Sequence, residues 1–250
     1  MKKRMTQPQD MTCGTPWKLI LMFAVPLILG NIFQELYTIV DTMVVGKKLG
    51  VNALAAVGAT GWVFMFNSML IQGFTQGFGI QIAKMVGEND TVKLKRAISN
   101  SIILSALLSI VLLLGMQLII NPAMHILRIP LNIRDISVTY LRVIFVGIPF
   151  SVAYNIFAVI LRSLGNSKTP LNAMVISTSS NIVLDILFVV GFQWGVIGAA
   201  VATIISQLLS AVYCFVILNK CDIFKANYIE FCLDIAETLV MLKLGTPMAI

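Results

Sequence analysis

Two aspartates lie inside long apolar segments, where an ionisable side chain is costly and is a functional candidate by default. Asp41 follows the letters YTIV, and Asp185 follows NIVL. A carboxylate oxygen suits a hard cation such as Na⁺. Two carboxylates close together also favour proton exchange, because they interact strongly and titrate as a pair. The pair therefore predicts cation binding or proton transfer.

Counting along ideal helices places the two aspartates at similar depth. At a rise of 1.5 Å per residue, Asp41 lies roughly 8 Å inward from Gly46. By the same rule, Asp185 lies roughly 9 Å inward from Gly191. If each segment crosses the membrane in the same direction, both acids lie in its outer half. An alternative is that each acid reaches water or lipid headgroups at the outer rim.

An amide and a hydroxyl extend this acid pair. Asn181 precedes Asp185 by four residues and so shares its helix face. Thr203 lies roughly 12 Å into the next apolar segment from Gly195, at a compatible depth. Four oxygen-bearing side chains at a similar membrane depth favour a shared binding site over separate residues at the membrane surface. We predict a cation site formed by Asp41, Asn181, Asp185 and Thr203.

Further polar residues follow the first apolar segment. Gln34, Tyr37 and Asp41 have the spacing i, i+3 and i+7, which makes one polar stripe along a helix. Glu35 lies one residue off that stripe, and it either lines a cavity or meets a polar neighbour at a helix contact. Asn155 is a buried amide in the fourth segment. Straight-helix counting places Asn155 nearer the cytoplasm than the acids, so joining them requires a bend.

The elements that carry these residues are membrane spans. Apolar residues make up 58% of the 250 residues and charged residues 12%, with a mean hydropathy of +0.91. A helical span needs about 20 mostly apolar residues. Pro26 and Pro149 lie inside such segments and predict bends. We expect an all-α membrane protein with six transmembrane helices, near Trp17–Val45, Ala53–Ile82, Ala97–Ile120, Ile136–Leu161, Leu171–Gly191 and Val196–Leu218.

The positive charges fix the expected orientation. With a cytoplasmic N-terminus, 13 of the 18 Lys and Arg residues lie inside, which leaves 5 outside. Cytoplasmic loops carry such an excess. The net charge of +7 is then the cytoplasmic rim facing anionic lipid, and no nucleic-acid partner is expected. We place the chain in the cell (inner) membrane.

Cysteine, histidine and glycine positions predict structure and not chemistry. No CxxC pair is present, and a reducing cytoplasmic side argues against disulfides. His125, the one histidine, is expected to be an ordinary residue of the outer loop. Gly73 and Gly77 form a GxxxG pair, which predicts close helix packing. The four cysteines expected at the cytoplasmic side are Cys13, Cys214, Cys221 and Cys232.

The C-terminal segment suggests an internal repeat. Residues 243–250 approach Pro247 through small residues, much as residues 22–29 approach Pro26, and repeats are common in transporters. A second lobe is expected beyond residue 250. The expected organisation is a cytoplasmic segment (1–16), a six-helix lobe (17–220), a cytoplasmic linker or amphipathic helix (221–243) and the start of the second lobe (244–250).

Four motifs in this order and spacing cover roughly residues 15–220 and resemble the N-terminal half of multidrug and toxic compound extrusion (MATE) transporters. The motifs are PLILGN from Pro26, DTMVVGKKLG with ALAAVG from Asp41, LRSLGNSKTP from Leu161, and WGVIGAAVAT from Trp194.

The resemblance implies one lobe of a twelve-helix antiporter that exports amphipathic, often cationic drugs against a flow of Na⁺ or H⁺. It implies the same four cation ligands, Asp41, Asn181, Asp185 and Thr203. Gln34, Tyr37 and Asn155 match cavity-lining positions. Pro26 matches a proline proposed to bend the first span. Small-molecule drugs and membrane lipid are the expected partners, with no cofactor besides the transported ion and no enzymatic activity.

Three alternatives remain open. The first is a lipid-linked oligosaccharide flippase of the same superfamily, which would need cavity arginines, whereas Arg142 and Arg162 are expected near span ends. The second is a split or non-functional half-transporter, because the family has two lobes. The third is an intramembrane aspartyl protease, which is disfavoured because Asp185 follows Val-Leu where a GxG element would be expected.

Overall fold

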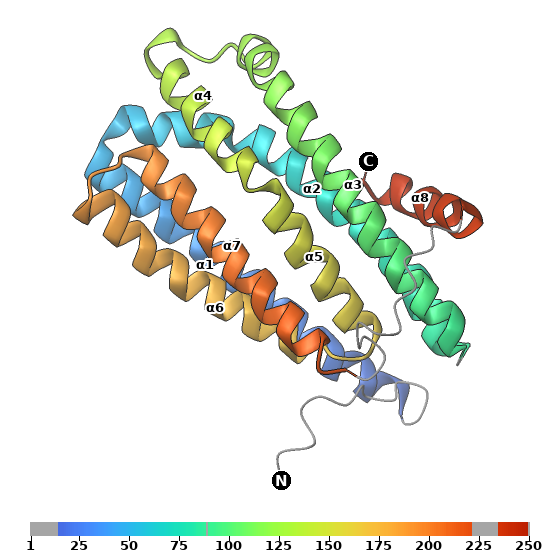
Figure 1. Cartoon of the computed structure of the whole chain (residues 1–250). Coiled ribbons are helices and arrows are strands. Elements are labelled where there is room, and N and C mark those ends of the chain that lie inside the picture. The colour runs from blue at the N-terminus through green and yellow to red at the C-terminus, as the bar shows by residue number, and fades with distance from the viewer. Residues whose placement is uncertain (1–14, 89, 222–234, 250) are drawn as a thin grey trace.

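The computed structural model describes residues 15–88, 90–221 and 235–249 (Figure 1). This part of the chain contains helices and no strand. The helices are α1 (Pro16–Leu49), α2 (Val51–Gly87), α3 (Thr91–Ile126), α4 (Leu131–Val146), α5 (Ile148–Ser163), α6 (Lys168–Asp185), the π-helix η1 (Ile186–Gly191), α7 (Val196–Leu218) and α8 (Ile235–Ala249).

The described residues contain five helical segments that are long and apolar enough to cross a membrane. The helices α4 and α5 make a sixth crossing if the bent pair counts as one span. Each expected span overlaps one of these segments, and α6 with η1 forms the fifth. The predicted all-α bundle of membrane helices is therefore confirmed.

The fourth crossing is bent by 46° between α4 and α5. Gly147 occupies the break, and Pro149 lies in the first turn of α5, where a missing N–H is tolerated. A Cβ atom on Gly147 would lie 2.6 Å from Ile204 Cγ1, so α5 and α7 approach closely here. The bend expected near Pro149 is therefore present. By contrast, α1 continues as one helix through Pro26.

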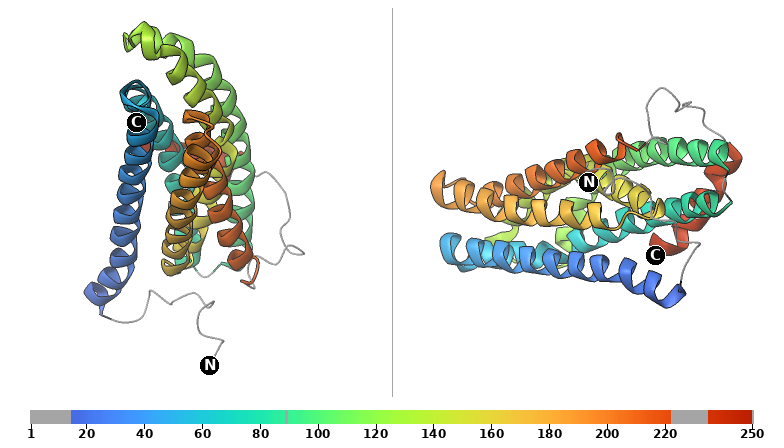
Figure 2. Two further views of the ribbon diagram at one scale, coloured as in Figure 1. Left: turned by 90° about the vertical axis from the view of Figure 1, so that its left-hand side faces the viewer. Right: turned by 90° about the horizontal axis from the view of Figure 1, so that it is seen from below.

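The helix ends expected in the cytoplasm gather at one end of the bundle, where α1 and α6 begin and α5 and α7 end (Figures 1 and 2). The helix α1 packs on α6, α6 on α7, α7 on α5, and α5 on α2 and α3. One apolar core lies around the cytoplasmic half, with Phe78 and Ile160 at its centre. A second core around Tyr140 and Phe145 fills the outer half. A third, smaller core contains Val45 on α1, Val189 on η1 and Ala199 on α7.

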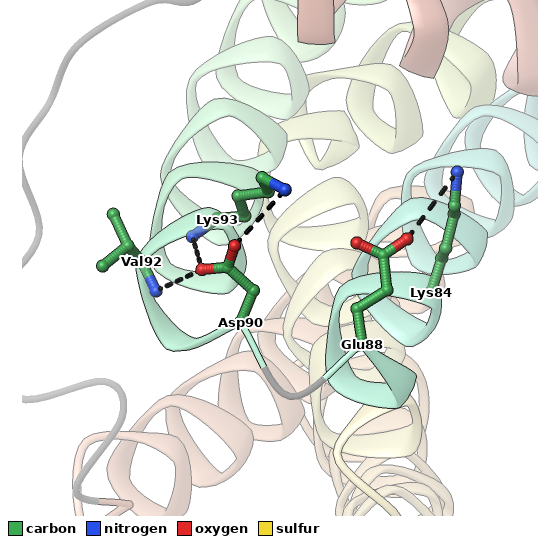
Figure 3. Close-up of polar contacts among 5 residues, drawn as sticks. All are labelled: Lys84, Glu88, Asp90, Val92 and Lys93. Carbon is green, nitrogen blue, oxygen red and sulfur yellow. Dashed lines mark hydrogen bonds and ion pairs between the residues drawn. The ribbon is translucent and has the colours of Figure 1, made fainter.

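The turn between α2 and α3 is held by local polar contacts (Figure 3). Asp90 Oδ1 accepts from the backbone N–H of Lys93 (3.0 Å) and Val92 (3.1 Å), which caps the start of α3. The same carboxylate pairs with Lys93 Nζ at 3.3 Å, and Lys84 pairs with Glu88 at 3.9 Å. The backbone N–H of Lys93, more than any other group, holds the pKa of Asp90 below its ordinary value.

Small residues join α8 to α2. A Cβ atom on Gly73 would overlap the backbone of Ala249, and one on Gly77 would overlap Gly245. The two helices lie side by side (Figure 1). The close packing predicted from the GxxxG pair is therefore confirmed, with α8 as the partner. Helix α8 also runs unbroken across the boundary that the sequence suggested between residues 243 and 244.

The minor sequence expectations have mixed outcomes. His125 lies in the last turn of α3 and not in a loop, and it contacts Arg134. Cys214 and Cys221 are buried and are not joined in a disulfide, and the Cys221 thiol donates to the Ile217 carbonyl at 3.7 Å. Cys13, Cys232, the segment 1–14 and most of the expected linker lie outside the described residues.

Candidate functional site

The four residues expected to bind a cation come together between α1, α6 and α7. Asp41 is 6% exposed, and Asp185, the last residue of α6, is fully buried. Asn181 lies one turn before Asp185 and is 1% exposed, and Thr203 on α7 is 4% exposed. The two carboxylates are near enough to interact electrostatically. The burial disfavours the alternative that the acids lie at a wet rim.

Most polar atoms of this cluster lack a protein partner. In the described part of the chain, Asp41 Oδ1, both carboxylate oxygens of Asp185 and both amide atoms of Asn181 are buried without a hydrogen bond. Buried polar atoms are rarely left so. Buried oxygen atoms without a hydrogen-bond partner can coordinate a hard cation. A proton shared by the two acids would also give these oxygen atoms a partner.

The side chains of this cluster differ from those of a typical transition-metal site, which consists of His, Cys, Asp or Glu ligands. The described residues contain no group of three His, Cys, Asp or Glu side chains placed to hold a metal ion. The cluster has two carboxylates, with an amide and a hydroxyl to complete it. Such a set fits a weakly held monovalent cation or a proton better than a structural zinc ion.

Tyr37 connects α1 to the cluster. Its hydroxyl lies 3.0 Å from Thr203 Oγ1. Thr203 donates its own proton to the Ala199 carbonyl at 3.1 Å, so the Tyr37 hydroxyl donates to Thr203. Tyr140 on α4 is buried and interacts electrostatically with Asp41, Tyr37 and Asp185. Tyr140 thus belongs to the surroundings of the acids, although its position in the sequence had not marked it.

A polar cavity lies on the other side of Tyr37 and Thr203. Five helices line it: α1, α2, α5, α6 and α7. The predicted cavity residues Gln34, Tyr37 and Asn155 are all in its wall, as is Pro26. Asp41 and Asp185 are not. The other polar wall residues are Asn31, Ser68, Gln72, Gln76, Ser151, Tyr154, Arg162, Ser167, Ser177, Thr178, Thr203, Gln207 and Ser210.

Asn155 lines the cavity and does not join the acids. Its Nδ2 donates to the Ser151 carbonyl at 2.9 Å, within α5. The bend at Gly147 redirects α5, yet Asn155 is in the cavity wall, whereas Asp41 and Asp185 are not. Glu35 is exposed on α1 and is absent from the cavity wall.

Arg162 lies in the last turn of α5, near a span end as expected, and its side chain also lines the cavity. A position near a span end therefore does not exclude a cavity arginine. Helix α6 begins six residues after Arg162, and Ser167, Pro170 and Leu171 at this turn line the same cavity.

The π-helix η1 begins directly after Asp185. Such helices are rare and occur often at functional sites. Gly198 on α7 packs against the Phe188 backbone, where an added Cβ would meet the Phe188 carbonyl carbon at 3.1 Å. Phe188 stacks on Trp194 at 5.0 Å between ring centroids, and Phe192 lies beside both. These rings lie at the outer end of the site. Nothing in the sequence marks the π-helix.

Comparisons with known proteins agree with this architecture. The family model described as MatE matches residues 26–187. The chain is 30% identical over 240 residues to the probable multidrug resistance protein YpnP of Bacillus subtilis, covering 95% of this chain and 53% of YpnP. It is 29% identical over 244 residues to the probable multidrug resistance protein YoeA of the same organism, covering 94% and 52%.

A solved structure supports the same match. It is the outward-facing conformation of a multidrug resistance MATE family transporter, with a TM-score of 0.87 and 27% identity over 94% of this chain and 52% of that one. The chain thus spans about half the length of the relatives it matches. Its six crossings correspond to one lobe of the larger fold.

Proposed function

Because the chain belongs to the MatE family of multi-pass membrane proteins, we propose that it is the cation-binding lobe of an exporter. The exported compounds are amphipathic and often cationic drugs or toxic compounds, and an inward flow of Na⁺ or H⁺ drives their release. The names of its relatives support the substrate class. A second lobe would complete the transporter.

The observation that carries this proposal is the buried pair of acids beside a polar cavity. Asp41 and Asp185 have carboxylate oxygens without protein partners, and the contact between Tyr37 and Thr203 separates them from the cavity. In this proposal Asp41 and Asp185 bind the cation, and the Asn181 amide and Thr203 hydroxyl complete its coordination. Gln34, Tyr37 and Asn155 bind substrate.

Coupling requires that cation and drug prefer different conformations. A ligand shifts an equilibrium only by its difference in affinity between the two states. Cation binding pulls Asp41 on α1 toward Asp185 on α6. Tyr37 lies four residues from Asp41 on the same helix, so this movement alters the cavity wall. In this scheme Pro26 is the hinge that lets α1 move, because proline interrupts the hydrogen bonds of a helix.

The test is cation-dependent efflux from cells that express the complete gene. We expect Asp41→Asn and Asp185→Asn each to remove the dependence of dye efflux on the Na⁺ or H⁺ gradient, because each removes one carboxylate from the cluster. Glu88→Gln is the matched control, since it removes an exposed carboxylate outside the cluster. Gradient-driven efflux that survives in both aspartate variants would overturn the proposal.

Arg162 keeps one alternative open, a flippase for lipid-linked oligosaccharides. The guanidinium in the cavity wall is a group that could bind a pyrophosphate. A flipping assay with a lipid-linked sugar in proteoliposomes distinguishes the two functions. Flipping without drug efflux would support the flippase, and efflux without flipping supports the exporter.

A further inference from the structure

The cavity wall carries one formal charge at neutral pH among the described residues, and it is the guanidinium of Arg162. The other polar wall residues are amides and hydroxyls. Both acids lie beyond the Tyr37–Thr203 contact and do not line the cavity. A ligand in this half of the cavity therefore meets a positive group directly and meets no carboxylate.

Arg162 has no acidic partner in the described part of the chain. The ion pairs there are Lys84–Glu88 and Lys93–Asp90. The ionisable groups that act on Arg162 electrostatically are the Tyr154 hydroxyl and the Cys214 thiol, which are uncharged in their ordinary state at neutral pH. A half-buried cation without a counter-ion is costly. A bound anion would remove that cost.

Hydroxyl groups line the same cavity as the guanidinium. Ser167 is 7% exposed and is in the cavity wall. It precedes α6 but makes no side-chain capping bond to that helix, so its hydroxyl can serve a ligand. Tyr154 is also in the wall and interacts electrostatically with Arg162. A guanidinium in a cavity that also offers hydroxyl donors can bind a planar carboxylate or a phosphate.

The position of Arg162 determines which end of a ligand it receives. Cavity residues on α5 run from Ser151 to Arg162, eleven residues or about 16 Å along the helix. Arg162 lies at the cytoplasmic end, and Tyr37 and Thr203 lie toward the outer end. An acidic group of the ligand would thus point to the cytoplasm while its apolar body lies among the residues between.

We propose that Arg162, with Ser167, forms an anion subsite at the cytoplasmic end of the cavity, which selects amphipathic ligands that carry a carboxylate or phosphate. This inference rests on the proposed role of the cavity in binding exported compounds. It extends the substrate class from cationic compounds to zwitterionic and acidic ones.

The experiment compares a free acid with its ester. Rhodamine B carries a carboxylate, and its ethyl ester keeps the same cationic ring system without it. Binding of both dyes to the full-length protein in phosphatidylcholine nanodiscs is measured by fluorescence anisotropy. We expect Arg162→Gln to weaken binding of the acid about tenfold, the usual scale for a lost charge-assisted hydrogen bond. Binding of the ester should stay within about twofold, since it makes no such bond.

Two variants control for charge and folding. Arg162→Lys keeps the positive charge and should retain most of the preference for the acid, though not the two-pronged geometry of a guanidinium. Arg142→Gln removes an exposed arginine on α4 that does not line the cavity, and it should change neither dye. Unchanged ester binding shows that a variant is folded.

The outcomes separate this inference from the proposed function. If neither dye binds the unaltered protein, both fail. If both dyes bind and Arg162→Gln affects them equally, the anion subsite is wrong and the exporter stands. Nanodiscs with added phosphatidylglycerol test the source of the anion. If phosphatidylglycerol weakens binding of rhodamine B to the unaltered protein but not to Arg162→Gln, a lipid phosphate occupies the subsite. If phosphatidylglycerol leaves binding of rhodamine B unchanged, the subsite binds a solute anion.

Discussion

The Tyr37 hydroxyl lies 3.0 Å from Thr203 Oγ1 and donates to it, joining α1 to α7 between the cavity and the buried acids. Asp41 follows Tyr37 by one helical turn on the same helix. Any shift of Asp41 toward a bound cation thus reaches the cavity through this contact.

Removing this hydrogen bond should weaken the coupling of cation to substrate. We expect Tyr37→Phe and Thr203→Val to lower cation affinity by about 1 kcal/mol each, the usual net value of one hydrogen bond. Thr203→Val also removes a proposed ligand, so its effect should be the larger. Isothermal titration with Na⁺ at fixed pH measures both. The double variant should be less than additive, and full additivity would show that the two hydroxyls act independently.

Adding a methyl group to the α2–α8 contact should destabilise the protein. A Cβ atom on Gly77 would overlap the Gly245 backbone, so Gly77→Ala forces the helices apart. Overpacking of this kind costs about 1–3 kcal/mol. The matched control is Gly58→Ala on the same helix, where nothing lies within 4 Å of an added Cβ. Thermal unfolding in detergent compares the two, and equal melting temperatures would disprove the contact.

The bend at Gly147 should be sensitive to side-chain size. Gly147→Ala places a methyl group 2.6 Å from Ile204 Cγ1, which should lower thermal stability and reduce efflux. Because the closest atom belongs to the Ile204 side chain, Ile204→Ala should restore part of the loss when combined with it. The Ile144 carbonyl oxygen, 3.0 Å from the added Cβ, would remain as a second close contact. Gly115→Ala has no neighbour within 4 Å and serves as the control. Failure of the double variant to recover would mean that backbone strain, and not crowding, is responsible.

Stability at low pH should depend on Asp90. Its pKa in the folded chain lies below the ordinary value of 3.8, so its cap stabilises the protein above that value. This stabilisation disappears as the pH falls through the lower, folded-state pKa. Asp90→Asn caps a helix without ionising, so its melting temperature should fall less between pH 5 and about pH 2. Parallel profiles for both proteins would contradict the assignment.

The sequence predicts the spans and the acid cluster for the same physical reason. Runs of about 20 apolar residues determine where a chain crosses a membrane, and a fixed rise per residue then gives depth. Asp41, Asn181, Asp185 and Thr203 could be grouped without any knowledge of which helices touch. The bend near Pro149 was also predictable, because proline lacks a backbone donor.

The surroundings of a residue could not be predicted in this way where they depend on which helices pack together. Arg162 lies at the end of α5 by linear counting, and only the arrangement of the helices places it in the cavity wall. Tyr140 reaches the acids because α4 and α7 pack together, a pairing that hydropathy does not encode. The partner of the GxxxG pair on α2 was open for the same reason.

The π-helix after Asp185 holds one residue more per turn than an α-helix would over the same rise. Deleting a single residue between Ile186 and Gly191 could thus leave the apolar character of the span unchanged and still relax η1 to α-helix. Because five α-helical residues turn about as far as six π-helical ones, that single deletion would keep Asp185 in nearly the same register with Trp194 and α7. A second deletion would rotate Asp185 by about 100°. The alignment of the acid with Asp41 therefore depends on the residue count of a segment that carries no polar group itself.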